Sequence, residues 1–492
     1  MQNREEIQMN PSFEVQSSKL TLFLRQYLSF IYLDPSYGSN IVYLKSEMNP
    51  HFSSPMLRLI FILFLLAKFT STQAQVIDQQ VDSSGLKGEG ISSFIQRYVN
   101  LRISGYLQPQ FQFASAKGSP SFSGGNFAPE VDNRFMIRRG RFRLDYFRTN
   151  AANMPSLFFG FQFDGTERGV NIRDFYGKVF ENKWNLFSIT TGMFPRPFGN
   201  EILLSSNARE TPERGRMSQL LMNTERDLGV MLSFEPQNKL HKLAWLKMDL
   251  GVFNGPGLPA VADIDRHKDL IGRISTKGFN LDKSKRWLIK GGASGYLGGL
   301  VQNSRFVYEA KASNGEYSMV ADSSQSNVQG LANRTYGGAD VQLLRKCKAG
   351  NTEIRAEFIL GTQPATATSS QSPFAVPKDA NGQFLPTYIR SFNGAYFYFI
   401  QNIFNAHHQI VVKYDWYDPN SVVSGKEVRA DKGFTAADIK FNTLGFGYIW
   451  YLSDNFKLVL YYDWVQNEHS GITGFEGDAN DNIFTARVQY KF

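Results

Sequence analysis

The segment FTARVQYKF at 484–492 alternates without exception between apolar and polar side chains. Successive side chains of a β-strand point to opposite faces, whereas a helix would spread both kinds around its circumference. The alternation therefore predicts a strand with one apolar face and one polar or charged face. It also places an aromatic residue, Phe492, at the end of the apolar face.

The same alternation recurs in short segments from residue 101 onward, separated by breaks rich in Gly, Asn, Asp, Pro and Ser. The most informative of these segments is MIRRGRFRLDYF at 136–147. In a strand, its residues Arg139, Arg141 and Arg143 stack on one face, opposite a face of Gly, Phe, Leu and Tyr. We therefore expect residues 101–492 to form one all-β domain.

The breaks between these segments alternate in length. LSDN at 452–455 is a tight turn, whereas QNEHSGITGFEGDAND at 466–481 is a long loop. Short turns at one end and long loops at the other are typical of a transmembrane antiparallel β-barrel, and counting segments gives about 16 strands. Closure is required because each backbone group inside a bilayer must find a partner within the protein. A barrel of this size leaves a water-filled lumen.

The amino-terminal part of the chain carries an export signal in an internal position. Within 56–74, a basic residue precedes the apolar run LIFILFLLA and a small-x-small site ends at Ala74, so we expect a signal peptide cleaved after Ala74. We then expect residues 1–55 to be a non-native upstream extension, with the true start at Met56 or alternatively at Met48. Residues 75–100 would be a polar periplasmic lead-in to the barrel.

The chain is basic, with 53 Lys and Arg against 44 Asp and Glu and a formal net charge of +9. In an exported protein this balance points to anionic solutes or lipopolysaccharide as readily as to nucleic acid. Nucleic-acid binding would need basic and stacking aromatic side chains on one surface, whereas here the two kinds alternate to opposite faces. We therefore expect no nucleic-acid partner. The single cysteine, Cys347, excludes an intrachain disulfide.

The arginine strand supplies candidate pore-lining residues. Arg139, Arg141 and Arg143 would project into the lumen as a column. Each guanidinium is permanently charged and can bind an oxyanion through two hydrogen bonds. Asp145 lies on the same face. Two interpretations stay open at this stage. The column contacts solutes, or it belongs to a network of arginine–carboxylate pairs that braces the barrel wall.

The longest break before the middle of the chain, 195–225, is expected to be a third outer loop that folds inward and constricts the lumen. Its basic residues are matched by glutamates, so we expect a mixed field at the constriction. The candidate constriction residues are Arg196, Glu201, Arg209, Arg214 and Arg216.

Several segments, in this order and spacing, resemble the phosphate-selective porin O/P family of bacterial outer-membrane porins. The resemblance covers nearly all of 101–492. The terminal aromatic is similar to that of the closing strand of bacterial outer-membrane barrels, where it belongs to the assembly signal. The motifs that carry the resemblance are FMIRRGRFRLDYF, IRDFYGKVF, SITTGMFPRPFGNE, ERDLGVMLSFEP, GVFNGPG, VVKYDWYDPN and QYKF.

The resemblance implies a 16-stranded trimeric barrel with inward loops and a basic track for anions. The chain matches the family's arginine strand and its loop entry, Pro197-Phe198-Gly199. It has no segment that aligns with the lysine-rich vestibule of phosphate-selective members. We therefore expect a broader anion porin or a general porin, with phosphate and polyphosphate among the candidate solutes.

The expected function is passive diffusion of small hydrophilic solutes, anions in preference, across a bacterial outer membrane. Expected partners are those solutes, membrane lipid and lipopolysaccharide, and two further copies in a homotrimer. No catalytic motif, cofactor motif or metal-ligand spacing stands out, so we expect neither an enzyme nor a cofactor. Two alternatives stay open, namely a phospholipase- or protease-like barrel enzyme and a closed structural or adhesive barrel.

Overall fold

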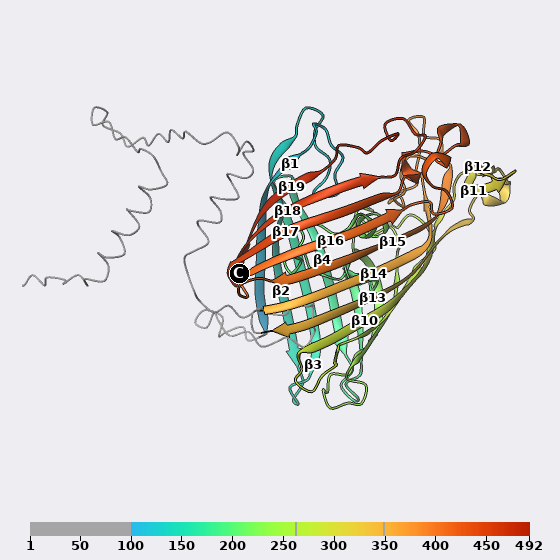
Figure 1. Cartoon of the computed structure of the whole chain (residues 1–492). Helices are drawn as coiled ribbons and strands as arrows, with labels where there is room; N and C mark the ends of the chain where they lie inside the picture. The colour runs from blue at the N-terminus through green and yellow to red at the C-terminus, as the bar shows by residue number, and fades with distance from the viewer. Residues whose placement is uncertain (1–99, 261–262, 348–349) are drawn as a thin grey trace, which may run out of the picture. The chain divides into compact units, whose positions relative to one another are not determined.

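The computed structural model describes residues 100–260, 263–347 and 350–492. The expected upstream extension and signal peptide, 1–55 and 56–74, lie outside the described residues. So does nearly all of the expected lead-in, 75–100. The described chain is almost entirely β-sheet and forms one barrel (Figure 1).

Sixteen strands of the described chain form the barrel wall, which confirms the number expected from the sequence. Each strand pairs antiparallel with its neighbours in chain order, and the last strand pairs with the first, which closes the sheet. The wall strands are β1 (Leu101–Ala114), β2 (Asn133–Thr149), β3 (Pro155–Thr166), β4 (Gly169–Phe180), β5 (Phe187–Pro195), β6 (Arg226–Phe234), β7 (Leu246–Phe253), β8 (Asp269–Thr276), β10 (Trp287–Val301), β13 (Leu331–Cys347), β14 (Gly350–Ala365), β15 (Thr387–Asn402), β16 (His408–Asp418), β17 (Phe441–Ser453), β18 (Phe456–Asn467) and β19 (Ile483–Lys491).

The two ends of the barrel differ in the length of their connections. We call the end where β1 begins and β19 finishes the turn end, and the opposite end the loop end. Turn-end connections are compact, as at 150–154 and 403–407, and most loop-end connections are long, as at 115–132 and 196–225. The predicted alternation of break lengths is therefore confirmed for most of the described connections. The exceptions are a tight turn at the loop end, 167–168, and two longer connections at the turn end, 235–245 and 277–286.

Side chains alternate across the wall as the sequence predicted. In β19, Thr485, Arg487 and Gln489 face the interior and are at most 5% exposed, whereas Tyr490 faces outward and is 50% exposed. The outer surface keeps large apolar side chains exposed on every part of the wall. Polar residues line the inside because a strand with one apolar face must turn the other face inward once the sheet closes.

The loop end carries a small folded cap. Its hairpin, β11 (Val307–Ser313) and β12 (Glu316–Asp322), lies beyond the ends of the wall strands (Figure 1). The hairpin residues Tyr317 and Met319 pack on a separate hydrophobic cluster formed by the last two loops. That cluster comprises Val423, Val428, Phe434, Ile439 and Ile472. The remaining short elements are β9 (Phe279–Asn280), η1 (Gln325–Asn327), η2 (Gly425–Glu427), η3 (Ala430–Lys432) and η4 (Ala436–Asp438).

The α-helix of the described chain, α3 (Arg216–Leu221), is only 6 residues long and belongs to the loop between β5 and β6. Within the described ranges, no helix has the length and hydropathy of a transmembrane helix.

Candidate functional site in the barrel lumen

The third loop, 196–225, folds into the lumen, as expected from the sequence. At its entry, the backbone N–H groups of Asn200 and Glu201 donate hydrogen bonds of 3.0 and 3.1 Å to the carboxylate of Glu357 on β14. Gly199 precedes them with φ +63°, a left-handed conformation that favours glycine. The Pro-Phe-Gly entry thus turns the chain away from the rim and ties it to the inner wall.

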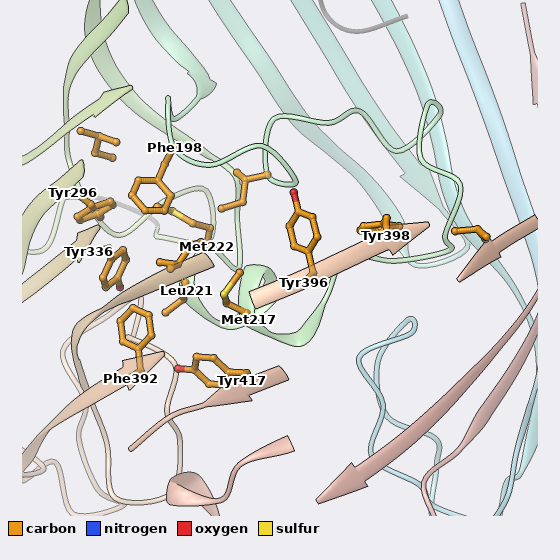
Figure 2. Close-up of a cluster of buried hydrophobic side chains, with 14 of the residues drawn as sticks. Phe198, Met217, Leu221, Met222, Tyr296, Tyr336, Phe392, Tyr396, Tyr398 and Tyr417 are labelled. Carbon is orange, nitrogen blue, oxygen red and sulfur yellow. The ribbon is translucent and has the colours of Figure 1, made fainter. Parts of the chain in front are cut away.

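A hydrophobic cluster holds the third loop against one side of the wall. From the loop, Phe198, Met217 and Leu221 point toward an aromatic surface, and the three are at most 6% exposed. Figure 2 shows these side chains interleaved with the wall residues Tyr296, Tyr336, Phe392, Tyr396 and Tyr417. Burial of so much apolar surface fixes the loop position and fills the lumen beside β10 and β13–β16. Sequence reasoning missed this cluster, because its wall members come from different strands.

The far part of the third loop is fixed by a carboxylate that three arginines share. Glu213 accepts a hydrogen bond of 2.6 Å from Arg139, and it contacts Arg138 at 2.9 Å and Arg487 at 2.8 Å. Burial would raise the pKa of Glu213, but the three guanidinium groups hold this pKa well below its usual range. Glu213 is therefore an anion that bridges β2 and β19 to the loop.

The predicted arginine column faces the lumen, and each member has a carboxylate partner. Arg141 contacts Asp164 at 3.1 Å, and Arg143 contacts Asp145 at 2.8 Å and Asp174 at 2.7 Å. Of the predicted pore-lining set, Arg143 and Asp145 keep the most exposed side chains, at 24% and 16%, against 6% or less for the other two. For the buried Arg139 and Arg141, the geometry favours the interpretation that they brace the wall. Solute contact by the column stays a prediction.

Three of the predicted constriction residues, Arg196, Glu201 and Arg214, stabilise the conformation of the third loop. Arg196 donates to the backbone carbonyl of Thr224 near the end of the third loop and to that of Gly255 in the loop after β7. Arg214 binds Glu225 at 2.8 Å and the carbonyl oxygen of Glu201 at 2.9 Å. The Glu201 carboxylate in turn accepts hydrogen bonds from Ser218 and from a wall tyrosine. These contacts fix the conformation of the loop. Because these charged groups already have partners within the protein, they are poorly available to a solute.

Arg209 and Arg216 differ from the other loop arginines. Arg209 is 3% exposed, and its guanidinium nitrogens have no hydrogen-bond partner among the described residues. Burial, with Arg214 and Arg139 nearby, holds the pKa of Arg209 well below its usual range. Arg216 is partly exposed at the start of α3 and lies over an aromatic ring, not over a carboxylate.

The first loop, 115–132, also folds into the lumen, which the sequence did not indicate. The hydroxyl of Ser123 donates to Asp463 of β18 at 2.6 Å, and Gln219 of α3 donates to the carbonyl oxygen of Phe122 at 2.8 Å. From β1, Gln112 donates to the Ser123 carbonyl at 2.5 Å. The Gly-, Ser- and Pro-rich sequence of this loop resembles that of any exposed loop, so no pattern marked it.

Lysines gather inside the barrel near the turn end. Lys247 lies 3.9 Å from Glu235 and 3.6 Å from Asp249, and Lys277 lies 3.1 Å from Glu235. Lys178 of β4 is within electrostatic reach of the same group. Three lysines thus surround two carboxylates. Each comes from a different strand or turn, so single-strand patterns could not reveal the cluster.

A cavity of about 260 Å³ opens on the other side of the turn end, beneath the third loop. Arg355 in its wall binds Glu210 through two hydrogen bonds of 2.9 Å and Glu353 at 2.6 Å. Lys457 donates to backbone carbonyls of the third loop. Cations outnumber carboxylates here as well. The charged lining residues are Lys346, Arg355, Lys457 and Lys491 against Glu210, Glu353 and Asp454.

In the part of the chain that the structure describes, no three His, Cys, Asp or Glu side chains are arranged to hold a metal ion.

No family model matches this chain, and no curated protein matches it either. Solved structures with a comparable barrel include OmpF of Salmonella typhi in complex with daunomycin, with 10% identity, a TM-score of 0.47, and coverage of 80% of this chain and 98% of that one. OmpT, an outer membrane protein of Vibrio cholerae in trimer form, shows 9% identity, a TM-score of 0.45, and coverage of 80% and 99%. A mutant Rh. blastica porin shows 9% identity, a TM-score of 0.39, and coverage of 80% of this chain and 100% of that one. At these values the comparisons assign no family.

Proposed function

We propose that this protein is an outer-membrane porin through which small hydrophilic solutes, anions in preference, diffuse passively. A closed wall with an apolar exterior and a polar interior is the structure that a water-filled pore through a bilayer requires. The observation that carries the anion preference is the excess of lysines inside the turn end of the barrel.

The exterior of the barrel supports a membrane location. Outward-facing aromatic pairs lie near both ends of the wall, in positions suited to the interfacial girdles of a transmembrane barrel. At the turn end, Phe187 pairs with Phe234 at 5.4 Å and Phe456 with Tyr490 at 5.0 Å between ring centroids. At the loop end, the pair is Phe111 with Phe135 at 4.8 Å.

The interior supports anion passage by its charge balance. The third loop contributes equal numbers of arginines and glutamates, so it adds no net charge. The two turn-end clusters each contain one cation more than carboxylates. A charged, low-dielectric channel concentrates counter-ions at its surface, so chloride or phosphate would be enriched at the turn end.

The decisive experiment is the reversal potential of the refolded protein in a planar bilayer under a KCl gradient. We expect chloride preference for the wild type. Replacing Lys178, Lys247 and Lys277 by Gln should lower the anion-to-cation permeability ratio by about tenfold at low salt, the low end of the enrichment that charged clefts produce. The effect should shrink in concentrated salt, where screening is stronger.

The matched control removes three lysines of the turn-end connections, Lys239, Lys242 and Lys283, which are exposed. This control changes the net charge equally and should leave the ratio unchanged. A wild-type potential near zero, or one that leans to cations, would reject the anion preference and keep the porin. Absence of conductance from folded protein would reject the porin and favour a barrel enzyme or a closed structural barrel.

Phosphate selectivity is a narrower part of the proposal. If phosphate is the preferred solute, micromolar phosphate should reduce chloride conductance, whereas equal sulfate should not. The same proposal includes export with cleavage after Ala74, contact with lipopolysaccharide, and assembly as a homotrimer. Amino-terminal sequencing and chemical cross-linking of the membrane-extracted protein test the cleavage site and the trimer.

A further inference from the structure

Arg216 occupies an unusual position in the lumen. Its guanidinium carbon lies 3.5 Å from the ring centroid of Phe441 and 4.4 Å from that of Phe122. The side chain is thus stacked between the start of β17 and the first loop. Among the described residues, no carboxylate oxygen lies within the 4.0 Å of a salt bridge to it, although Asp415 and Asp481 act on it electrostatically.

The other arginines of the third loop do not share this arrangement. Arg196 donates to two backbone carbonyls and is buried, Arg214 is bound by backbone carbonyls and by Glu225, and Arg209 is enclosed. Aromatic faces attract a cation without cancelling its charge, and the planar guanidinium keeps its edge available for hydrogen bonds. Among the described residues, Arg214 and Arg216 are the partly exposed arginines of the loop, and Arg216 is the one of the two without an ion-pair partner.

The first loop fixes this stacked position. The carbonyl oxygen of Phe122 accepts a hydrogen bond from Gln219, one turn along α3 from Arg216. The next residue, Ser123, is bonded to both Asp463 and Gln112. Because Phe122 and the residue after it are bonded to α3 and to the wall, Phe122 cannot leave Arg216 unless the first loop moves.

The other ring that stacks on Arg216, that of Phe441, packs against the cap. Phe441 meets Phe475 edge-on, with ring centroids 6.3 Å apart and an interplanar angle of 87°. Both rings pack on the hydrophobic cluster of the last two loops. Arg216 therefore joins the first loop, the third loop and the cap at one point.

The two inward loops meet beside Arg216 at a small crevice. A cavity of about 30 Å³ is lined by residues 120–123 of the first loop, by 213–216 of the third loop and by the wall. This volume suits roughly one water molecule. The hydroxyl of Tyr461 and one carboxylate oxygen of Asp481 border the cavity and lack hydrogen-bond partners among the described residues. The crevice is thus polar and close to the stacked guanidinium.

We propose that the first and third loops together form the constriction, and that Arg216, positioned by Phe122 and Phe441, selects anions there. This inference rests on the proposed porin function and names a selectivity residue for it. Phe122 acts through Arg216 and through the position of the first loop, so it is a positioning residue.

The test compares charge loss inside and outside the constriction. We expect Arg216→Gln to lower the anion-to-cation permeability ratio by roughly fivefold, the factor that a unit charge about 4 Å away contributes in water. Lys117→Gln is the control, because Lys117 is an exposed first-loop residue whose contact with Glu130 lies on the outer surface. Arg216→Lys keeps the charge, so it should retain most of the ratio.

A second pair of variants tests the positioning by Phe122. Phe122→Ala leaves every charge in place, and we expect a larger single-channel conductance together with a smaller loss of selectivity than in Arg216→Gln. Phe122→Tyr keeps the ring and should match the wild type. Phe384→Ala is the control for loss of a loop-end aromatic, since Phe384 is 45% exposed and lies in a different loop.

These outcomes separate the inference from the proposed function. If the wild type prefers anions and Arg216→Gln behaves like Lys117→Gln, the inference fails while the porin stands. The inference also fails if Phe122→Ala changes neither conductance nor selectivity. If the folded wild type shows no anion preference, the proposed anion selectivity itself fails. Loss of heat-resistant migration on gels identifies a misfolded variant. If Arg216→Gln is misfolded, the comparison of Phe122→Ala with Phe122→Tyr decides the inference.

Discussion

Glu213 of the third loop binds Arg139 of β2 through two hydrogen bonds of 3.0 and 2.6 Å. Both side chains are at most 6% exposed. A bidentate arginine–carboxylate pair is among the strongest polar contacts in proteins. The strand arginine that the sequence offered as a solute contact is therefore also the anchor of the loop that narrows the lumen.

Replacing Glu213 by Gln should detach the far part of the third loop. Arg139 and Arg487 would be left buried without their counter-charge, which costs about 3–5 kcal/mol when one partner of a buried pair is removed. The barrel itself should still form, since its backbone ladders do not involve Glu213. We expect larger, noisier single-channel conductance and faster proteolysis within 196–225.

Glu130→Gln is the matched control for this prediction. Its carboxylate contacts Lys117 at 3.3 Å, and both side chains are well exposed, at 87% and 60%. Exposed pairs contribute at most about 1 kcal/mol, so this variant should match the wild type. Equal conductance and equal cleavage for the two variants would show that Glu213 does not anchor the loop.

Gly199→Ala should loosen the entry to the same loop. A methyl group at this position would collide with the carboxylate of Glu357, which accepts the hydrogen bonds that hold the loop entry. The left-handed backbone adds a penalty of about 1–2 kcal/mol. We expect a lower thermal midpoint for loss of loop protection, measured by proteolysis during a temperature ramp.

Gly474→Ala separates the two causes. Gly474 also has a positive φ, +86°, but nothing lies within 4 Å of a methyl group built there. The thermal midpoint for cleavage of its own loop, 468–482, should fall by the backbone penalty alone. If both variants shift the midpoint equally, collision with Glu357 contributes nothing and the anchoring of the loop entry is misassigned.

Local alternation predicted the faces of the strands correctly because its period of two is a property of the strand alone. The inward direction of Arg139, Arg141 and Arg143 followed from that period, and so did the polar interior face of 484–492. Strand number followed from the turn signals. These features need no knowledge of which strands are neighbours.

The partners of those inward residues could not be predicted in the same way. Arg139 meets Glu213 because a loop 74 positions away crosses the lumen, and the crossing depends on tertiary packing. The lysine cluster of Lys178, Lys247 and Lys277 depends on register and strand tilt, which set the height of each side chain in the barrel. The inward fold of the first loop likewise rests on hydrogen bonds to distant strands.

Selectivity should depend on pH through Asp481 in the last loop. Burial raises the pKa of Asp481 to about 6, against the opposing effect of Arg216, while Asp478 adds to the rise. The carboxylate is thus charged at pH 7.5 and neutral at pH 5. Since its negative charge offsets that of Arg216, anion preference should increase as the pH falls through about 6.

Reversal potentials at pH 7.5 and pH 5 test this prediction. In Asp481→Asn the side chain is neutral throughout, so its anion preference at pH 7.5 should exceed that of the wild type, and its pH dependence should be weaker. Identical pH profiles for the two proteins would show that Asp481 does not act on the permeating ions.

Met217→Ala should free the third loop without dissolving the barrel. Met217 is 1% exposed within the aromatic cluster of Figure 2, and truncating a buried side chain of this size costs about 2–5 kcal/mol. The β-sheet signal in circular dichroism should be unchanged, whereas conductance should rise as α3 detaches. Leu240→Ala, at a 92% exposed turn-end position, is the control and should alter neither. A parallel loss of β-sheet signal in Met217→Ala would mean that the loop core supports the wall itself, and not only the constriction.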